Sequence, residues 1–371
     1  MTGRIFAIAA VLFAMAFAVA ACGGDDDDGG GGGGSADSGE AKGKIGVILP
    51  DAASSARWET ADRRFLGEAF EAAGVEYDIQ NANGDKAKFS TIADQMINGG
   101  VTVLMLVNLD SPSAATVIKK AKDQGIPAID YDRLTLGGGA DYYVSFDNVA
   151  VGTTIGEGLV KCMQDNGNDS GPVALLNGSP TDNNATLFKQ GYEKAITGAG
   201  FEVAADQSVP DWDNTKAGTI FEQMYTKANG DFVGVAAAND GLGGAVAAVL
   251  KRNGDTDKIP TTGQDATAEG LQRVLLGSQC MTVYKAIKKE ADAASGLAIA
   301  LTKGDQAGAD KLASGSVEDT ETGEQVKSVL LEPEGITKEN VKDVVADGFV
   351  AADDICTNAA LKKACSENGV Q

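Results

Sequence analysis

From Lys44 onward, short apolar runs alternate with longer segments in which apolar residues recur at helical spacing. The apolar runs predict strands at 44–50, 75–83, 101–108, 126–132 and 142–148. The segments between them predict helices at 58–73, 88–99 and 111–125, each ending at or just before a glycine. Strands that alternate with helices of this length predict parallel sheets with helices packed on both faces.

The same alternation begins again near 147–149. Further strands are predicted at 171–178, 201–210, 232–240, 259–265 and 280–285, with helices between them and a long helix from about 285 to 302. These units are too many for one sheet, so we predict an α/β fold with two doubly wound parallel-sheet lobes. The last part of the chain is irregular and acidic, and it predicts one extended and one helical piece within 328–349.

The first 43 residues differ from the rest of the chain. Residues 1–21 carry a single charged side chain, Arg4, followed by an apolar run, which is typical of a secretory signal peptide. The run ends in VAAC, which resembles the bacterial lipobox, so we expect Cys22 to be lipidated and to anchor the protein to a membrane. Residues 22–43 are rich in glycine and aspartate and predict a flexible tether. The alternative is an ordinary signal peptide with an incidental cysteine.

The composition excludes several kinds of chemistry. The chain has no histidine, which excludes Ser-His-Asp triads, Cys-His pairs and imidazole metal ligands. Its 31 basic and 53 acidic side chains leave a net charge of -22, which argues against nucleic acid as a partner. Phosphate-binding glycine motifs are missing, and the aspartate run near the N-terminus lacks the spacing of a calcium loop. We therefore expect no enzyme activity, no cofactor and no metal.

Beyond Cys22, the chain has four cysteines, and an exported protein can form disulfides. An even number fits two bridges, and three pairings are open. Two of the four, Cys356 and Cys365, are close enough in sequence to close a local loop. The four candidates are Cys162, Cys280, Cys356 and Cys365.

Polar side chains recur where the predicted strands end, several of them beside an aromatic residue. The segments are SSARW (54–58), YDR (131–133), SPTDNN (179–184), PDWDN (210–214), AAND (237–240), TGQD (262–265) and TVYK (282–285). Ligands of open parallel sheets bind beyond the carboxyl ends of strands. Carboxylates, amides and guanidinium groups suit vicinal hydroxyls, and tryptophan faces suit the C–H faces of a pyranose. These segments predict a cleft for a neutral, hydroxyl-rich small molecule.

Each of these residues also has a purely structural interpretation. An aspartate or asparagine at a strand end can cap the next helix, and a tryptophan can fill a core. Arginines can be surface charges, and a lysine can extend its stem along apolar surface. The recurrence of polar groups at nearly every strand end, in both halves of the chain, favours the cleft.

These segments resemble the periplasmic monosaccharide-binding proteins of ABC importers, and in particular the D-xylose-binding branch. The matching stretches are SSARW, QNANGDKAKFSTIADQMINGGV, YDR, YVSFDN, NGSPTDNNATLF, AAND, TGQDA and MTVYK, in order across 45–350. The resemblance implies two similar α/β lobes that are joined by three crossovers and close over one sugar. The second crossover falls near Lys285, so the helix after it is expected to return to the first lobe. The lobes would comprise 44–147 plus about 285–308, and 148–284 plus about 309–371.

The resemblance also implies a set of ligand residues. From the first lobe they are Arg57, Trp58, Asp132 and Arg133; from the second, Asn184, Trp212, Asn239 and Asp265, with Lys285 at the crossover. Trp58 and Trp212 would sandwich the sugar ring, although the sequence around Trp212 departs most from the family pattern. Asp132, Asp265 and Asn239 would accept hydrogen bonds, and the basic side chains would donate them.

The function implied is that of a monomeric, lipid-anchored solute-binding protein at the outer side of the cell membrane or in the periplasm. It would deliver a monosaccharide, D-xylose or a related aldopyranose, to an ABC transporter permease. One alternative is a sensor subunit that presents sugar to a chemoreceptor or a two-component kinase. Another is a binder of many aldoses, because a relative in the same branch has broad specificity.

Overall fold

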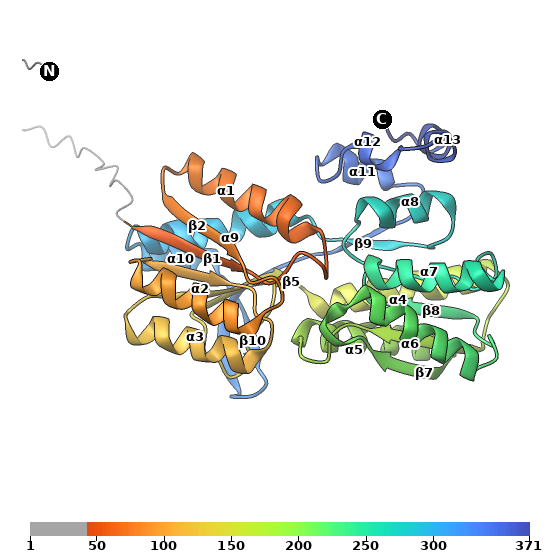
Figure 1. Ribbon diagram of the computed structural model, residues 1–371, viewed down its shortest axis with the longest axis horizontal. Helices are drawn as coiled ribbons and strands as arrows, with labels where there is room; N and C mark the ends of the chain where they lie inside the picture. Colours follow the sequence, from red (N-terminus) through yellow and green to blue (C-terminus); the bar gives the residue numbers. More distant parts are fainter. Residues whose placement is uncertain (1–42) are drawn as a thin grey trace, which may run out of the picture. The chain divides into compact units, whose positions relative to one another are not determined.

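The computed structural model describes residues 43–371 (Figure 1). The predicted signal peptide 1–21, the lipidation site Cys22 and all but the last residue of the tether 22–43 lie outside the described residues. The alternation of strands and helices predicted from Lys44 onward is present, and two separate sets of strands result.

The first lobe is built on a seven-stranded sheet with the order β10-β11-β5-β4-β3-β1-β2. All neighbours are parallel except β10 and β11. The central strands are buried along almost their whole length, because helices cover both faces of the sheet. The strands are β1 (Lys44–Leu49), β2 (Glu76–Asn81), β3 (Val103–Leu106), β4 (Ala128–Tyr131), β5 (Tyr142–Phe146), β10 (Gly315–Asp319) and β11 (Glu324–Leu331).

Helices α1 and α9 share one face of this sheet, and α2 and α3 share the other (Figure 1). The segment predicted as one helix from Trp58 begins with a π-helical stretch, η1, and continues as α1. The helices of this lobe are η1 (Trp58–Asp62), α1 (Arg63–Ala72), α2 (Lys86–Asn98), α3 (Ser111–Asp123), α9 (Ile287–Thr302) and α10 (Gln306–Leu312).

The second lobe contains a parallel sheet of order β7-β6-β8 and the antiparallel pair β9 and β12. The strand predicted at 259–265 forms only isolated bridges, Val235 with Thr261 and Gln264 with Val283, which link the two sheets. Pro260 has no N–H to donate, so regular pairing is interrupted there. The strands are β6 (Pro172–Asn177), β7 (Glu202–Ser208), β8 (Gly234–Ala237), β9 (Thr282–Tyr284) and β12 (Glu334–Ile336).

The second lobe also carries most of the helices that follow residue 147. They are α4 (Asn148–Asp165), α5 (Asn183–Gly198), the 3-10 turn η2 (Pro210–Trp212), α6 (Asn214–Lys227), α7 (Asp240–Asn253), α8 (Ala268–Leu276), α11 (Val341–Ala346), α12 (Ala352–Ile355) and α13 (Ala359–Glu367). Among the described residues, none of these helices or those of the first lobe is long and apolar enough to cross a membrane.

Within residues 43–371 the chain passes between the lobes three times, as expected. The passages follow β5, β9 and β11, and the helix after Lys285, α9, packs on α1, β1 and β3 of the first lobe. The first and third passages are joined by a hydrogen bond of 2.9 Å from the Asp147 amide to the Leu331 carbonyl. The second and third are joined where Tyr284 pairs with Glu334. The three passages therefore form one connected hinge.

One boundary of the predicted lobes is wrong. We expected the chain from about 309 onward to lie with the second lobe, but β10 and β11 extend the first sheet, and β11 pairs in parallel with β5. Residues with buried and exposed side chains alternate along part of β11, as is usual for a strand with one covered face. The Gly137 amide also donates to Asp319 across 2.8 Å, which fixes the β10 hairpin to the first lobe. The last part of the chain is thus more regular than its composition indicated.

Two disulfides settle the pairing that the sequence left open. Cys162 on α4 is bonded to Cys280, just before β9, and Cys356 is bonded to Cys365 in the C-terminal region. Both bridges lie within the second lobe.

Candidate ligand-binding site

A pocket lies between the two lobes, where the carboxyl ends of their strands meet. All nine residues that the sequence singled out line it, together with five others. The lining residues are Ser54, Ser55, Arg57, Trp58, Asp132, Arg133, Asp182, Asn184, Phe188, Trp212, Asn239, Gln264, Asp265 and Lys285. The structure therefore brings together residues that are up to 231 positions apart in the chain, from Ser54 to Lys285.

The strand ends place the polar side chains at this edge. Asp132 directly follows β4, Asn239 follows β8 after one further residue, and Lys285 directly follows β9. In doubly wound sheets this edge is where ligands bind. Burial is nearly complete: Asp132 is 3% exposed and Lys285 is 4% exposed.

Three of the lining residues have a backbone conformation in the left-handed region. The φ angles are 63° for Asp132, 55° for Trp212 and 96° for Asp265. Such angles are uncommon for residues other than glycine, and they cluster at functional sites when the surrounding structure holds them. At Asp132, three groups from both lobes hold the carbonyl: the Ser145 hydroxyl at 2.7 Å, the Tyr143 hydroxyl at 3.2 Å and the Asn184 amide at 2.8 Å.

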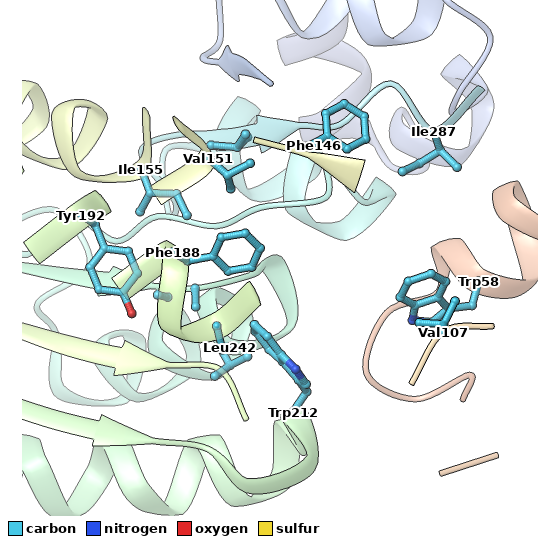
Figure 2. Packing of buried hydrophobic residues seen from close by; sticks show 14 of the residues in the cluster. Trp58, Val107, Phe146, Val151, Ile155, Phe188, Tyr192, Trp212, Leu242 and Ile287 are labelled. Carbon is cyan, nitrogen blue, oxygen red and sulfur yellow. The ribbon is translucent and has the colours of Figure 1, made fainter. Parts of the chain in front are cut away.

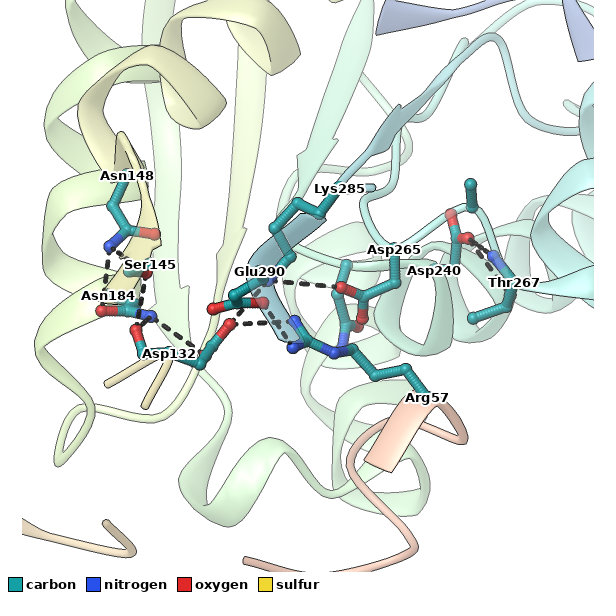
Figure 3. A network of polar contacts seen from close by, with 12 residues as sticks. Arg57, Asp132, Ser145, Asn148, Asn184, Asp240, Asp265, Thr267, Lys285 and Glu290 are labelled. Atoms are coloured by element: carbon teal, nitrogen blue, oxygen red, sulfur yellow. Dashed lines mark hydrogen bonds and ion pairs between the residues drawn. The ribbon is translucent and has the colours of Figure 1, made fainter. Parts of the chain in front are cut away.

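Arg57 is the centre of a buried ionic network (Figure 3). Its Nε and Nη2 donate to the two carboxylate oxygens of Asp62 across 2.9 and 2.7 Å. Its Nη1 donates to Asp132 across 2.9 Å, and Nη2 donates also to Glu290 across 2.9 Å. The Tyr131 hydroxyl donates to Asp62 across 2.7 Å. The guanidinium group is therefore held in one orientation at the floor of the pocket.

The charges in this network shift one another's pKa values. Burial alone lowers the pKa of Arg57, but the carboxylates of Asp62, Asp132 and Glu290 hold it well above its usual value. Burial raises the pKa of Asp132, but the charges of Lys285, Arg57 and Arg133 outweigh burial and keep the pKa below its usual range. Both groups are thus ionised at neutral pH.

Several polar contacts join the two lobes at the pocket. Lys285 Nζ lies 3.3 Å from the Asp132 carboxylate and 3.7 Å from that of Asp265. Arg133 Nε lies 3.0 Å from Asp182 Oδ2. The Asn184 side chain donates to both the carbonyl and the carboxylate of Asp132. Polar groups of both lobes therefore meet directly at the pocket.

The two tryptophans enter the pocket from opposite lobes (Figure 2). The Trp58 ring has the Arg57 guanidinium 4.2 Å from its centroid and the Arg133 guanidinium 5.5 Å from it. Trp212 donates through Nε1 to Asp182 across 3.0 Å and packs edge-on against Phe188. A Cβ on Gly178 would lie 2.1 Å from the Trp212 ring, so only a glycine admits the ring at this place. Both rings are thus positioned by specific neighbours.

The combination of groups suits a neutral polyol. Carboxylates accept hydrogen bonds, guanidinium and ammonium groups donate them, and amides do both, while aromatic faces cover apolar C–H groups. Among residues 43–371, no cluster of three or more histidine, cysteine, aspartate or glutamate side chains could hold a metal ion.

Comparison with known proteins decides the family. A sequence profile described as "Periplasmic binding protein domain" matches residues 45–306. The D-xylose-binding periplasmic protein of Escherichia coli is 34% identical over 311 residues, which cover 82% of this chain and 90% of that protein. The chain belongs to the periplasmic binding protein family.

Other relatives are named for, or were solved with, different sugars. The multiple sugar-binding periplasmic receptor ChvE of Rhizobium radiobacter is 30% identical and covers 83% of this chain and 90% of its own. A solute-binding protein of an ABC transporter from Clostridium phytofermentans, solved with bound β-D-glucose, superimposes with a TM-score of 0.75. It is 25% identical and covers 84% of this chain and 99% of its own. The relatives are solute-binding proteins, and this binding protein is likewise not an enzyme.

Two asparagines of the lining differ in whether they cap a helix. Asn239 does cap a helix, because its Oδ1 accepts from the Leu242 amide across 2.9 Å, but its Nδ2 also donates to the Ser54 carbonyl across 3.3 Å. Asn184 is not a cap, because Asp182 caps α5. Capping therefore explains the Oδ1 atom of Asn239 but not its Nδ2 atom, and it does not explain the position of Asn184.

Several residues of the site escaped sequence reasoning. Ser54 and Asp182 lie inside SSARW and SPTDNN, so their segments had been identified although the residues had not. Asp62 lies five residues after Arg57, and the π-helical stretch between them brings its carboxylate back to the guanidinium group. Glu290 is 233 positions from Arg57, and no local pattern indicates it.

Proposed function

We propose that this protein captures a monosaccharide, D-xylose or a related aldopyranose, between its lobes and delivers it to the permease of an ABC importer. The observation that carries the proposal is the pocket lined by both tryptophans and by the ionic network of Asp132, Arg57 and Lys285. The similarity to the D-xylose-binding periplasmic proteins of Escherichia coli and Haemophilus influenzae, at 34% and 33% identity, supports D-xylose as the first sugar to test. Capture and delivery require no cofactor, and we propose that the protein acts as a monomer.

Each lining residue has a chemical role in this proposal. Trp58 and Trp212 cover the two faces of the sugar ring and exclude water. The carboxylates of Asp132 and Asp265 accept hydrogen bonds from sugar hydroxyls, and Asn239 both donates and accepts. The hydroxyl oxygens accept in turn from the basic groups and the remaining amide, which are Arg57, Arg133, Lys285 and Asn184.

Closure of the lobes is the proposed mechanism of capture. A sugar that contacts both lobes binds the closed arrangement better than the open one, and it therefore shifts the population toward the closed state. The connected hinge of three passages allows the lobes to move about one region of the chain. The closed state is then the form that the permease receives.

A broader specificity is the second candidate. Two relatives at 30% and 29% identity are named multiple sugar-binding proteins, and solved neighbours at 25% and 26% identity hold glucose. Hexoses therefore belong in any test beside pentoses.

We also propose that the protein is exported and anchored through a lipid on Cys22. The periplasmic relatives support export, and the VAAC sequence supports lipidation. Expression of the full chain with labelled palmitate in a bacterial host tests the anchor. The wild type should incorporate label and remain with membranes, and Cys22→Ser should do neither; equal labelling of both would contradict the anchor.

Isothermal titration of the purified protein against single sugars tests the function. The panel consists of D-xylose, L-arabinose, D-ribose, D-glucose and D-galactose. We expect saturable binding of at least one aldose with one site per chain. D-xylose alone would support the narrow specificity, and several aldoses would support the broad one. No binding of any pentose or hexose at millimolar concentration would refute the proposed function.

A further inference from the structure

Glu290 on α9 lies beneath the pocket and outside its lining, and it contacts the residue that the proposed function places against the sugar. Its Oε2 accepts a hydrogen bond from Arg57 Nη2 across 2.9 Å, and the side chain is fully buried. Its other oxygen, Oε1, is buried and has no hydrogen-bond partner among the described residues. A buried carboxylate oxygen without a partner is costly, so its presence calls for an explanation.

Charged groups from several elements surround Glu290, and Figure 3 shows Arg57, Asp132 and Lys285 among them. Two cations, Arg57 and Lys285, stand against three carboxylates, which are those of Asp62, Asp132 and Glu290 itself. The titratable groups around Glu290 are Arg57 just before η1, Asp62 at the end of η1, Tyr131 on β4, Asp132 after β4, Tyr143 on β5 and Lys285 after β9. These groups alone leave one negative charge in excess when all three acids are ionised, and the buried carboxylate of Asp265, 3.7 Å from Lys285, adds a second.

A proton on Glu290 lowers that excess charge by one. Burial raises the pKa of Glu290 well above its ordinary value, and the neighbouring charge of Asp132 raises it further. Arg57 and Lys285 act in the opposite direction but do not reverse the shift. Of the three carboxylates, Asp62 shares two hydrogen bonds with Arg57, and Asp132 contacts both cations. Glu290 receives one hydrogen bond and is the acid best placed to hold the proton.

We propose that Glu290 is a positioning residue for Arg57 and that sugar binding at this site is coupled to the uptake of a proton by Glu290. The inference rests on the proposed sugar-binding function, because Arg57 acts on the ligand and Glu290 acts through Arg57. Its Oε2 binds Nη2, while Nη1 stays beside Asp132, where a sugar hydroxyl can reach both groups.

The direction of the coupling follows from desolvation. When the lobes close over a sugar, water leaves the cluster, so the charged form of Glu290 is penalised more in the bound state than in the free state. The pKa of Glu290 is then higher in the bound state, and binding takes up a proton. Affinity is therefore full below the pKa of the free state and falls as the pH rises through the pKa of the bound state. A single proton limits the fall to about tenfold per pH unit.

Two variants separate the hydrogen bond from the proton. Glu290→Gln keeps an oxygen that can accept from Arg57 but cannot titrate, and Glu290→Leu removes both properties. Asp292→Asn is the matched control, because Asp292 lies on the same helix in an exposed pair with Lys288. The sugar that binds the wild type most tightly is titrated calorimetrically with each protein from about pH 5 to about pH 9, and melting temperatures are measured without sugar.

The wild type and Asp292→Asn should lose affinity as the pH rises, whereas the profile of Glu290→Gln should be flat. Titration of the wild type in buffers of different ionisation enthalpy should show proton uptake, and Glu290→Gln should show less. At low pH, Glu290→Leu should bind about 10-fold to 100-fold more weakly than the wild type, since a hydrogen bond to a charged group is lost. If the leucine variant does not fold, the glutamine variant alone decides.

A pH profile of Glu290→Gln that matches the wild type would overturn the coupling. An affinity of folded Glu290→Leu equal to that of the wild type would overturn the positioning role. Both results presuppose a wild type that binds sugar, so they are distinct from failure of the proposed function, in which the wild type itself binds none.

Discussion

Asp132 is the residue on which the proposed site depends most, and Asp132→Asn is the sharpest perturbation of it. The substitution preserves the size of the side chain, and asparagine tolerates the φ angle of 63° found at this position. It removes the charge that pairs with Arg57 at 2.9 Å and with Lys285 at 3.3 Å. The change therefore addresses electrostatics and hydrogen bonding with little effect on packing.

The expected cost follows from the contacts of both carboxylate oxygens. Oδ1 accepts from Asn184, and Oδ2 accepts from Arg57 and Lys285, so every neighbour is a donor. An asparagine must direct its own NH2 group at one of these donors, whichever way the amide is turned. It also leaves two buried cations without their shared counter-charge. Loss of one partner of a buried charge pair costs roughly 2–5 kcal/mol, so we expect sugar affinity to fall by at least about 30-fold.

Calorimetric titration at neutral pH, with the sugar that binds the wild type most tightly, measures this loss. The matched control is Asp94→Asn, because Asp94 is half exposed and pairs with Lys120 on the surface of the same lobe. An exposed pair contributes less than about 1 kcal/mol to stability, and the control should bind as the wild type does. A folded Asp132→Asn protein that binds within threefold of the wild type would refute the reasoning.

Three further predictions concern the second lobe and the interior. Gly178→Ala should displace the Trp212 ring, because the new Cβ would lie 2.1 Å from it. Titration should then show sugar binding at least about tenfold weaker, while the far-ultraviolet circular dichroism spectrum stays unchanged. Unaltered affinity would mean that the Trp212 ring does not contact the sugar. Burial raises the pKa of Asp130 to about 7, so its contribution to stability is full below about pH 4 and is lost as the pH rises through 7. The melting temperature of the wild type relative to Asp130→Asn should accordingly fall over that range, and a constant difference would contradict the assignment. Replacement of Cys162 and Cys280 by serine should lower the unfolding free energy by up to about 5 kcal/mol, because this disulfide joins residues 118 positions apart. Replacement of Cys356 and Cys365 should lower it by about 2.5 kcal/mol, because that disulfide joins residues only 9 positions apart. Chemical denaturation measures both losses, and a larger loss for the C-terminal disulfide would contradict the chain-entropy explanation.

The parts of the fold that could be predicted are those that a local pattern determines. Buried strands such as 103–106 are continuous apolar runs, and helices such as α3 have a proline in the first turn and an aspartate cap. Pairing between distant segments follows different physics. The partner of β11 is β5, 185 positions earlier in the chain (Lys327 pairs with Tyr142), and nothing in the sequence of β11 identifies that neighbour. The boundary of the second lobe was placed wrongly for this reason.

The residues of the candidate site likewise fall into those that the sequence could predict and those that it could not. The residues at strand ends could be found, because parallel sheets bring these ends to one edge whatever their separation in sequence. Asp62 and Glu290, which bind the guanidinium group of Arg57, could not be found in this way. Asp62 reaches it through a π-helical stretch, and Glu290 reaches it from a helix that returns after the second passage between the lobes. Such contacts depend on how the lobe is assembled, and no repeating pattern in the sequence indicates them.

A crystal structure of the protein grown with D-xylose tests the central claim most directly. We predict one pyranose in the pocket between the lobes, with its ring between Trp58 and Trp212 and with hydroxyls hydrogen-bonded to Asp132 and Asp265. A second crystal grown with D-glucose compares the two proposed specificities. A sugar bound elsewhere on the protein, or a ring that contacts neither tryptophan, would contradict the account.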